Sequence, residues 1–104
     1  MSPEEFSEQY RKKAQEWATQ DGEARKLEKL EKVVFSEIVN HSEGSISSRE
    51  HMARANDHYK KVCLDGIEAR TKANLLKAEL DSMQIAWDTW RTLSATKRAE
   101  ARII

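Results

Sequence analysis

The feature that most constrains this chain is a stripe of apolar residues in its second half, spaced three and four residues apart without a fault. Such a repeat places all its members on one face of a helix and has the period of a left-handed coiled coil. No proline interrupts it, so the sequence predicts one long helix from about residue 48 to about residue 101. The stripe comprises Met52, Ala55, Tyr59, Val62, Gly66, Ala69, Ala73, Leu76, Leu80, Met83, Trp87 and Trp90.

A second helical pattern occupies the first forty residues. Ser2, Pro3 and Glu5 have the arrangement of a capping box with proline at the first helical position. Apolar residues then recur at helical spacing as far as Ile38. The pair Asp21-Gly22 could interrupt the helix, but the apolar stripe keeps its phase across it. We therefore expect a single helix over about residues 3–40.

The segment between the two patterns is the one convincing loop. It gathers glycine and serine over about residues 41–47. A short loop forces its two helices to lie side by side and antiparallel, within one domain covering residues 1–104. The second helix is longer, so its end should extend beyond the first. A turn at Gly44 implies a register that pairs Ala24 with Gly66, Trp17 with Ala73 and Tyr10 with Leu80.

Two helices alone bury a seam rather than a core. A weaker apolar strip off the main stripe, made of Leu64, Ile67, Leu75, Ile85 and Leu93, also needs a partner. The sequence thus predicts an all-α fold, a long antiparallel, coiled-coil-like hairpin that dimerises into a helical bundle. The residues expected at the interface are Tyr59, Gly66, Leu76, Leu80, Met83, Trp87 and Trp90.

Charge and cysteine content set the expected environment. The 18 basic and 18 acidic residues cancel, which gives no general reason to expect nucleic-acid binding. Cys63 is the only cysteine, so no internal disulfide can form and a reducing compartment is the simplest interpretation. No apolar run approaches the roughly 18 residues of a membrane span, and the acidic N-terminus lacks signal-peptide features. We expect a cytoplasmic protein without membrane contact.

No catalytic constellation is visible. The sequence contains no nucleophile–base motif and no glycine-rich phosphate loop. His41, His51 and His58 fall close together in sequence but match no metal-binding spacing, so we interpret them as exposed helical residues. The prediction is a protein that is not an enzyme, with no catalytic residue, no metal site and no cofactor.

The tryptophans and the basic C-terminal end allow two interpretations. Trp87 and Trp90, followed by Arg91, could form an aromatic platform for single-stranded bases. Because both lie in phase with the main stripe, we favour burial against a second chain. Lys97, Arg98 and Arg102 suit the negative end of a helix dipole, and together with Arg91 they are the possible nucleic-acid contacts.

Segments 54–59, 68–74 and 90–100 carry a resemblance. With their ending Trp-Arg followed by Ala-Thr-Lys-Arg-Ala-Glu, they resemble small all-helical proteins of phages and prophages, of the kind encoded among recombination and replication genes. The resemblance covers about half the chain. It implies an oligomeric, non-enzymatic accessory or adaptor protein that acts through a protein partner, in DNA recombination or replication. The alternatives are a single-stranded DNA-binding protein and a phage-encoded inhibitor of a host enzyme.

Overall fold

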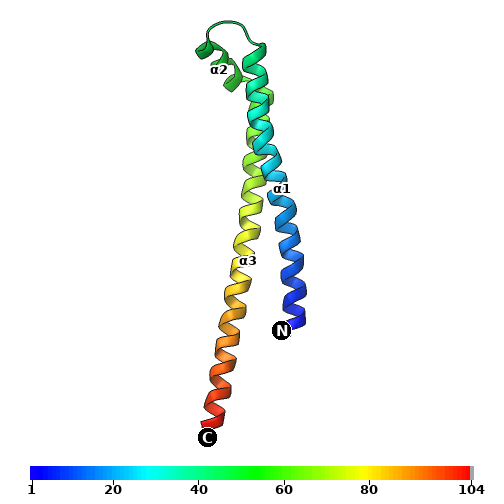
Figure 1. Cartoon of the computed structure of the whole chain (residues 1–104), viewed down its shortest axis with the longest axis vertical. Helices are drawn as coiled ribbons and strands as arrows, with labels where there is room; N and C mark the ends of the chain where they lie inside the picture. Colours follow the sequence, from blue (N-terminus) through cyan, green and yellow to red (C-terminus); the bar gives the residue numbers. More distant parts are fainter. Residues whose placement is uncertain (104) are drawn as a thin grey trace.

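The computed structural model describes residues 1–103 and forms a long helical hairpin. Helix α1 spans Pro3–His41, α2 spans Ile46–Ala55 and α3 spans Asp57–Ile103. Helices α1 and α3 run antiparallel, and α3 continues well beyond the N-terminus of α1 (Figure 1). The molecule measures 84 × 22 × 15 Å. The predicted all-α hairpin is confirmed.

Helix α1 begins where its capping residues predict and continues without a break to His41. The hydroxyl of Ser2 accepts a hydrogen bond from the backbone N–H of Glu5 at 3.1 Å, which satisfies one of the free donors of the first turn. Asp21-Gly22 does not interrupt α1. The side chain of Asp21 is held there by Arg25, at 2.9 Å, and by Arg70 of α3, at 2.7 Å. The prediction of a single first helix is correct.

The prediction of one continuous helix from about residue 48 is wrong, because the chain breaks at Asn56. This residue has an extended backbone, with φ −68° and ψ 130°. Its side-chain oxygen accepts a hydrogen bond from the backbone N–H of Tyr59 at 3.1 Å. A side chain of this type competes with the helical backbone and favours an N-cap, and Asp57 suits the first turn that follows. Asn56 thus ends α2 and starts α3.

The break turns α2 aside at the tip of the hairpin (Figure 1). Met52 and Ala55, expected on the buried stripe, are consequently exposed, and Ala53 is buried in their place. The guanidinium of Arg54 lies 5.7 Å from the centre of the Phe35 ring, a cation–π distance. His51 and His58 are seven residues apart, but they belong to different helices and therefore do not share one helical face.

The register of α1 against α3 also differs from the one expected. The position of a β-carbon on Gly66 is 3.7 Å from the β-carbon of Leu27, rather than beside Ala24. The amine of Lys77 lies over the ring of Trp17, at 5.4 Å. The expected register assumed a turn at Gly44 alone, whereas the reversal of the chain also includes α2.

The seam between α1 and α3 changes in width along its length. Small residues fill its middle, where Ala24, Ala69 and Ala73 are buried. Aromatic residues fill the end near the N-terminus, where Phe6 stacks on Trp87 with ring centres 4.5 Å apart. Small side chains allow close approach and large ones hold helices apart. Figure 1 accordingly shows α1 and α3 close together near the tip of the hairpin and further apart toward the N-terminus of α1.

One ion-pair cluster that the sequence did not single out crosses this seam. Arg70 of α3 donates to Asp21 at 2.7 Å and to Glu28 at 2.8 Å. The two acids are seven residues apart, hence on one face of α1, and Arg70 lies between them. The hydrogen bonds from Arg70 are the main cause of a lowered pKa at both carboxyl groups.

We expect this cluster to make the stability of the folded protein depend on pH in the acidic range. A carboxyl group whose pKa is lowered on folding stabilises the protein above its unfolded pKa, about 4, and loses that effect as the pH falls through its folded value. Arg70→Met should therefore lower the melting temperature at pH 7 and have little effect near pH 2. Lys61→Met, which removes an exposed pair with Asp65 on the same helix, is the matched control and should change little. Equal effects of the two variants at pH 7 would contradict the assignment.

Candidate interaction surface at the open end of the hairpin

A row of four aromatic rings lies where α1 begins and α3 continues. Tyr10 stacks on Phe6 at 5.7 Å, Phe6 on Trp87 at 4.5 Å, and Trp87 on Trp90 at 5.1 Å between ring centres. The first two rings come from α1 and the last two from α3. We call this row the aromatic end. Trp90 is its outermost member, and 49 % of its surface is exposed.

The aromatic end has chemically different surroundings on its two sides. On one side lies a shallow, mainly apolar depression of about 250 Å³, lined by Met1, Gln9, Met83 and Ala86 besides the rings of Phe6, Trp87 and Trp90. On the other side, Arg91 and Arg98 line a second depression together with Phe6, Trp87 and Trp90. Methionines adapt to apolar partners of varied shape, whereas guanidinium groups suit carboxylates and phosphates. The site therefore offers an apolar face and a cationic face.

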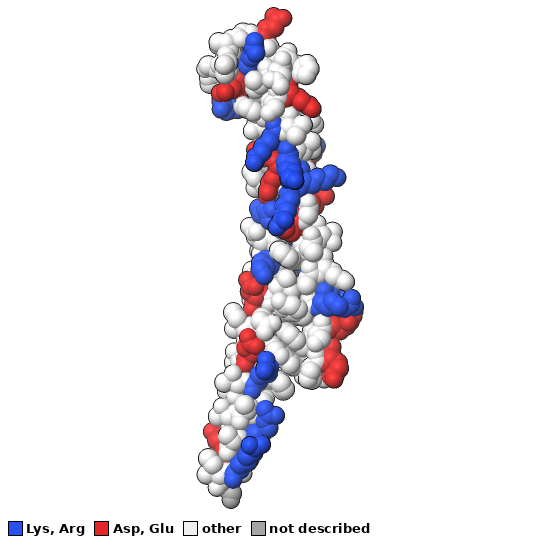
Figure 2. Space-filling view, in the orientation of Figure 1, with Lys and Arg blue, Asp and Glu red and all other residues white. Residues whose placement is uncertain are grey.

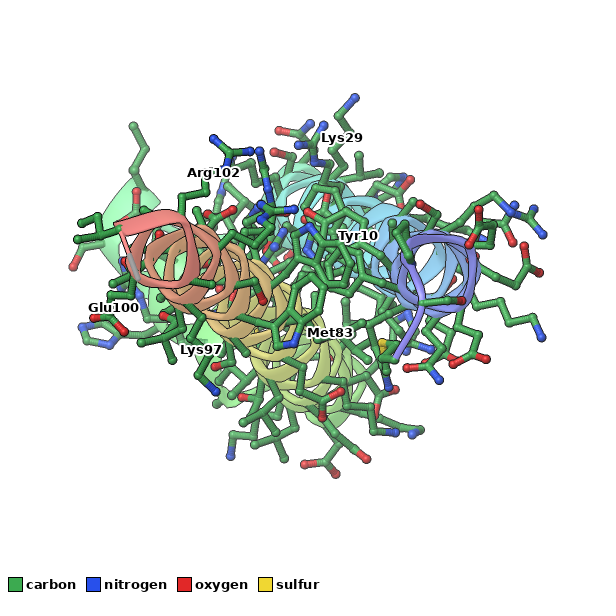
Figure 3. The ribbon with its side chains drawn as sticks, turned by 90° about the horizontal axis from the view of Figure 1, so that it is seen from below. Tyr10, Lys29, Met83, Lys97, Glu100 and Arg102 are labelled. Atoms are coloured by element: carbon green, nitrogen blue, oxygen red, sulfur yellow. The ribbon has the colours of Figure 1, made fainter. Side chains whose placement is uncertain are left out.

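The basic residues predicted at the C-terminal end do not form one patch. Arg91, Arg98 and Arg102 are spaced by seven and four residues and so share one face of α3. Lys97 lies off that face, and Figure 3 shows it on the opposite side of the helix from Arg102. Figure 2 shows Lys and Arg side chains along one edge of the end of α3. Of the four residues predicted to contact nucleic acid, the three arginines therefore share one face of α3 and Lys97 does not.

Most residues predicted at the interface lie in the seam of the hairpin itself. Gly66 and Leu80 are buried, and Met83 and Trp87 are half-buried. Figure 3 shows Tyr10 and Met83 between the two helices. Tyr59 packs on Phe35 at 5.5 Å, and Leu76 is half-buried. Trp90 is the one member of the predicted set that is exposed.

The sequence interpretation left Phe6 and Met1 out of this site. The helical spacing of Phe6 does predict that it lies on the face of α1 that packs on α3. The register decides which ring it meets, however, and the register expected from the loop was displaced. The contribution of α1 to the aromatic end therefore became apparent only with the structure.

Cys63 and the three histidines lie away from the aromatic end. Burial raises the pKa of the Cys63 thiol, and the thiolate is the reactive form of cysteine. His41, His51 and His58 are all exposed. Within residues 1–103, no three His, Cys, Asp or Glu side chains lie close enough to hold one metal ion.

Comparisons with protein-family models, with curated proteins and with solved structures found no match to this chain. None of the helices described over residues 1–103 combines the length and the apolar character that crossing a membrane requires. Among the described residues, the aromatic end is the surface most suited to binding.

Proposed function

We propose that this protein is a non-enzymatic, oligomeric adaptor of phage or prophage origin that acts in the cytoplasm. Its role is to support DNA recombination or replication through protein–protein contacts. The phage setting comes from the resemblance of segments 54–59, 68–74 and 90–100. The mode of action comes from the rigid hairpin, which presents a binding surface at a fixed distance from its tip.

The observation that carries this proposal is the exposure of Trp90 at the end of a continuous aromatic row. An exposed aromatic surface flanked by polar groups usually marks an interaction site. Tryptophan and arginine are the residues most often found at binding hot spots, and Arg91 and Arg98 lie beside Trp90. Phe6 and Trp87 support Trp90 from within, so its ring is presented on an ordered surface.

The first test is the mass of the protein in solution. We expect sedimentation equilibrium at micromolar concentration to show a dimer or higher oligomer, because among residues 1–103 the buried hydrophobic side chains are alanines, two valines and Leu80. Circular dichroism on the same sample should show a helical protein. A folded, monodisperse species of 12.0 kDa would contradict the oligomeric part of the proposal.

A second candidate function, single-stranded DNA binding, is favoured by one observation. Trp90, Arg91 and Arg98 line a third depression of about 510 Å³, together with Asp88. Stacking of bases on aromatic rings and contact of phosphates with arginine are the two usual elements of such binding. The adaptor remains the preferred proposal, because Asp88 and Glu100 dilute the positive charge of this end.

Fluorescence anisotropy with a labelled oligonucleotide tests this candidate. If it is correct, binding should weaken steeply with salt, and joint reversal of Arg91, Arg98 and Arg102 to glutamate should abolish it. Lys97→Glu is the matched control, since Lys97 lies off their shared face, and it should weaken binding much less. Absence of binding at low salt would rule out the DNA-binding candidate and leave the adaptor.

A further inference from the structure

Helix α3 carries a second apolar surface on the side that faces away from α1. Five large side chains form it, and each leaves between 56 % and 66 % of its surface exposed: Leu64, Ile67, Leu75, Ile85 and Leu93. The residues that pack on α1, such as Ala73 and Leu80, lie on the opposite side of the helix. A helix that is apolar on two opposite sides is suited to a position between two neighbours, and α1 supplies only one.

Small, uncharged residues complete this surface. Thr71, Ala78, Ser82 and Thr89 fill the positions between the large side chains, and all four are exposed. At 3.6 residues per turn, the nine positions from Leu64 to Leu93 stay within a sector of about 80°. We call these nine positions the back stripe. It contains no charged residue, although 35 % of the whole chain is charged.

The order of side chains in the back stripe makes it complementary to itself in the antiparallel direction. When Ala78 is placed on a twofold axis, Leu75 comes opposite Ser82 of a second copy. In the same register, Ile85 faces Thr71 and Ile67 faces Thr89, so that three of the five large side chains meet a smaller one. Leu64 meets Leu93 at the two ends. This alternation is what close packing of two helices requires.

On one flank of α3, charge does not oppose the pairing in this register. In an antiparallel helix pair related by a twofold axis, like flanks of the two helices face each other. The charged side chains on one flank, Lys61, Asp65, Glu68 and Lys72, lie before Ala78. They therefore face the second half of the partner's flank, where Ala86 and Trp90 lie. Near the axis, Glu79 is already paired with Lys13 of its own chain at 2.9 Å.

We propose that the back stripe binds a second copy of this chain, with the two α3 helices antiparallel and Ala78 at the twofold axis. The ten large side chains of two copies would bury on the order of 1,000 Å², about the lower limit for a specific interface. The inference rests on the proposed function in that an oligomer is assumed there. It goes further by locating the oligomer interface on the side of α3 that faces away from α1.

Disulfide trapping tests the direction and the register. In a Cys63→Ser background, Ala78→Cys should form a covalent dimer on mild oxidation, because the two sulfurs meet at the axis. Leu64→Cys alone should not, since two copies of residue 64 would lie about 42 Å apart. An equal mixture of Leu64→Cys and Leu93→Cys chains should give a mixed dimer. Failure of Ala78→Cys to cross-link, or self-cross-linking of Leu64→Cys, would overturn the arrangement.

Sedimentation of charged variants separates this inference from the proposed function. Leu75→Glu should weaken self-association at least tenfold while circular dichroism stays unchanged, because the residue is exposed within one chain. Val33→Glu, at an exposed position of α1, is the matched control and should leave association unchanged. If Leu75→Glu remains oligomeric while Trp90→Ala dissociates, the back stripe is not the interface and the proposed function stands. A monomeric wild-type chain overturns both.

Discussion

Trp90→Ala is expected to cost about 2 kcal/mol or more of association free energy, the range of binding hot spots. The loss should appear in the oligomer or in the complex with the partner protein. The physical reason is the position of Trp90 at the exposed end of the aromatic row. Trp90 has no neighbour outward along the row, and stacking on Trp87 at 5.1 Å holds its exposed ring in place. Burial of that ring by a second chain would remove a large apolar area from water.

The hairpin itself should survive this substitution. Phe6 and Trp87 still stack, and Leu80 still closes the seam, so circular dichroism should show unchanged helix content. Trp17→Ala is the matched control, because Trp17 lies inside the seam against Lys77. It should lower the melting temperature and leave association almost unaffected. Unchanged oligomer mass and unchanged partner binding for Trp90→Ala would mean that the tryptophans serve only the fold of one chain.

Gly66→Leu is expected to destabilise the hairpin by about 1–3 kcal/mol through overpacking. A β-carbon at this position would lie 3.7 Å from the β-carbon of Leu27, an ordinary contact. The further carbons of leucine would have to occupy the space of Leu27. Gly66→Ala, by contrast, should stabilise α3 by about 1 kcal/mol, because alanine is the better helix former. Thermal unfolding should show a lower melting temperature for Gly66→Leu and a higher one for Gly66→Ala.

Gly22 provides the control for this pair of variants. Apart from its chain neighbours and the adjoining helix backbone, no atom of residues 1–103 lies within 4 Å of a β-carbon placed on Gly22. Gly22→Leu should therefore raise stability by roughly the helix-propensity difference, up to about 1 kcal/mol. If Gly66→Leu also stabilised the protein, α1 and α3 would not approach closely at that point, and the seam described above would be incorrect.

The sequence by itself determined which segments are helical and that they form an antiparallel hairpin. Local signals were sufficient for this. The capping residues at Ser2 and Pro3 start α1, and the apolar spacing from Tyr59 to Trp87 sets the buried face of α3. The glycine and serine residues before Ile46 mark the turn. Each signal acts within one or two helical turns, so it can be recognised without knowledge of the partner helix.

Only the tertiary structure decided the break at Asn56, the register and the composition of the aromatic end. Asn56 lies where the apolar phase continues unchanged, and the outcome depended on whether its side chain capped α3 or left the helix intact. That choice is a balance of about 1 kcal/mol, and contacts of α2 with α1, such as Arg54 over Phe35, contribute to it. Once α2 turned aside, the register moved with it, because helical side-chain spacing alone fits several registers. The meeting of Phe6 with Trp87 follows from that register and not from either segment of sequence alone.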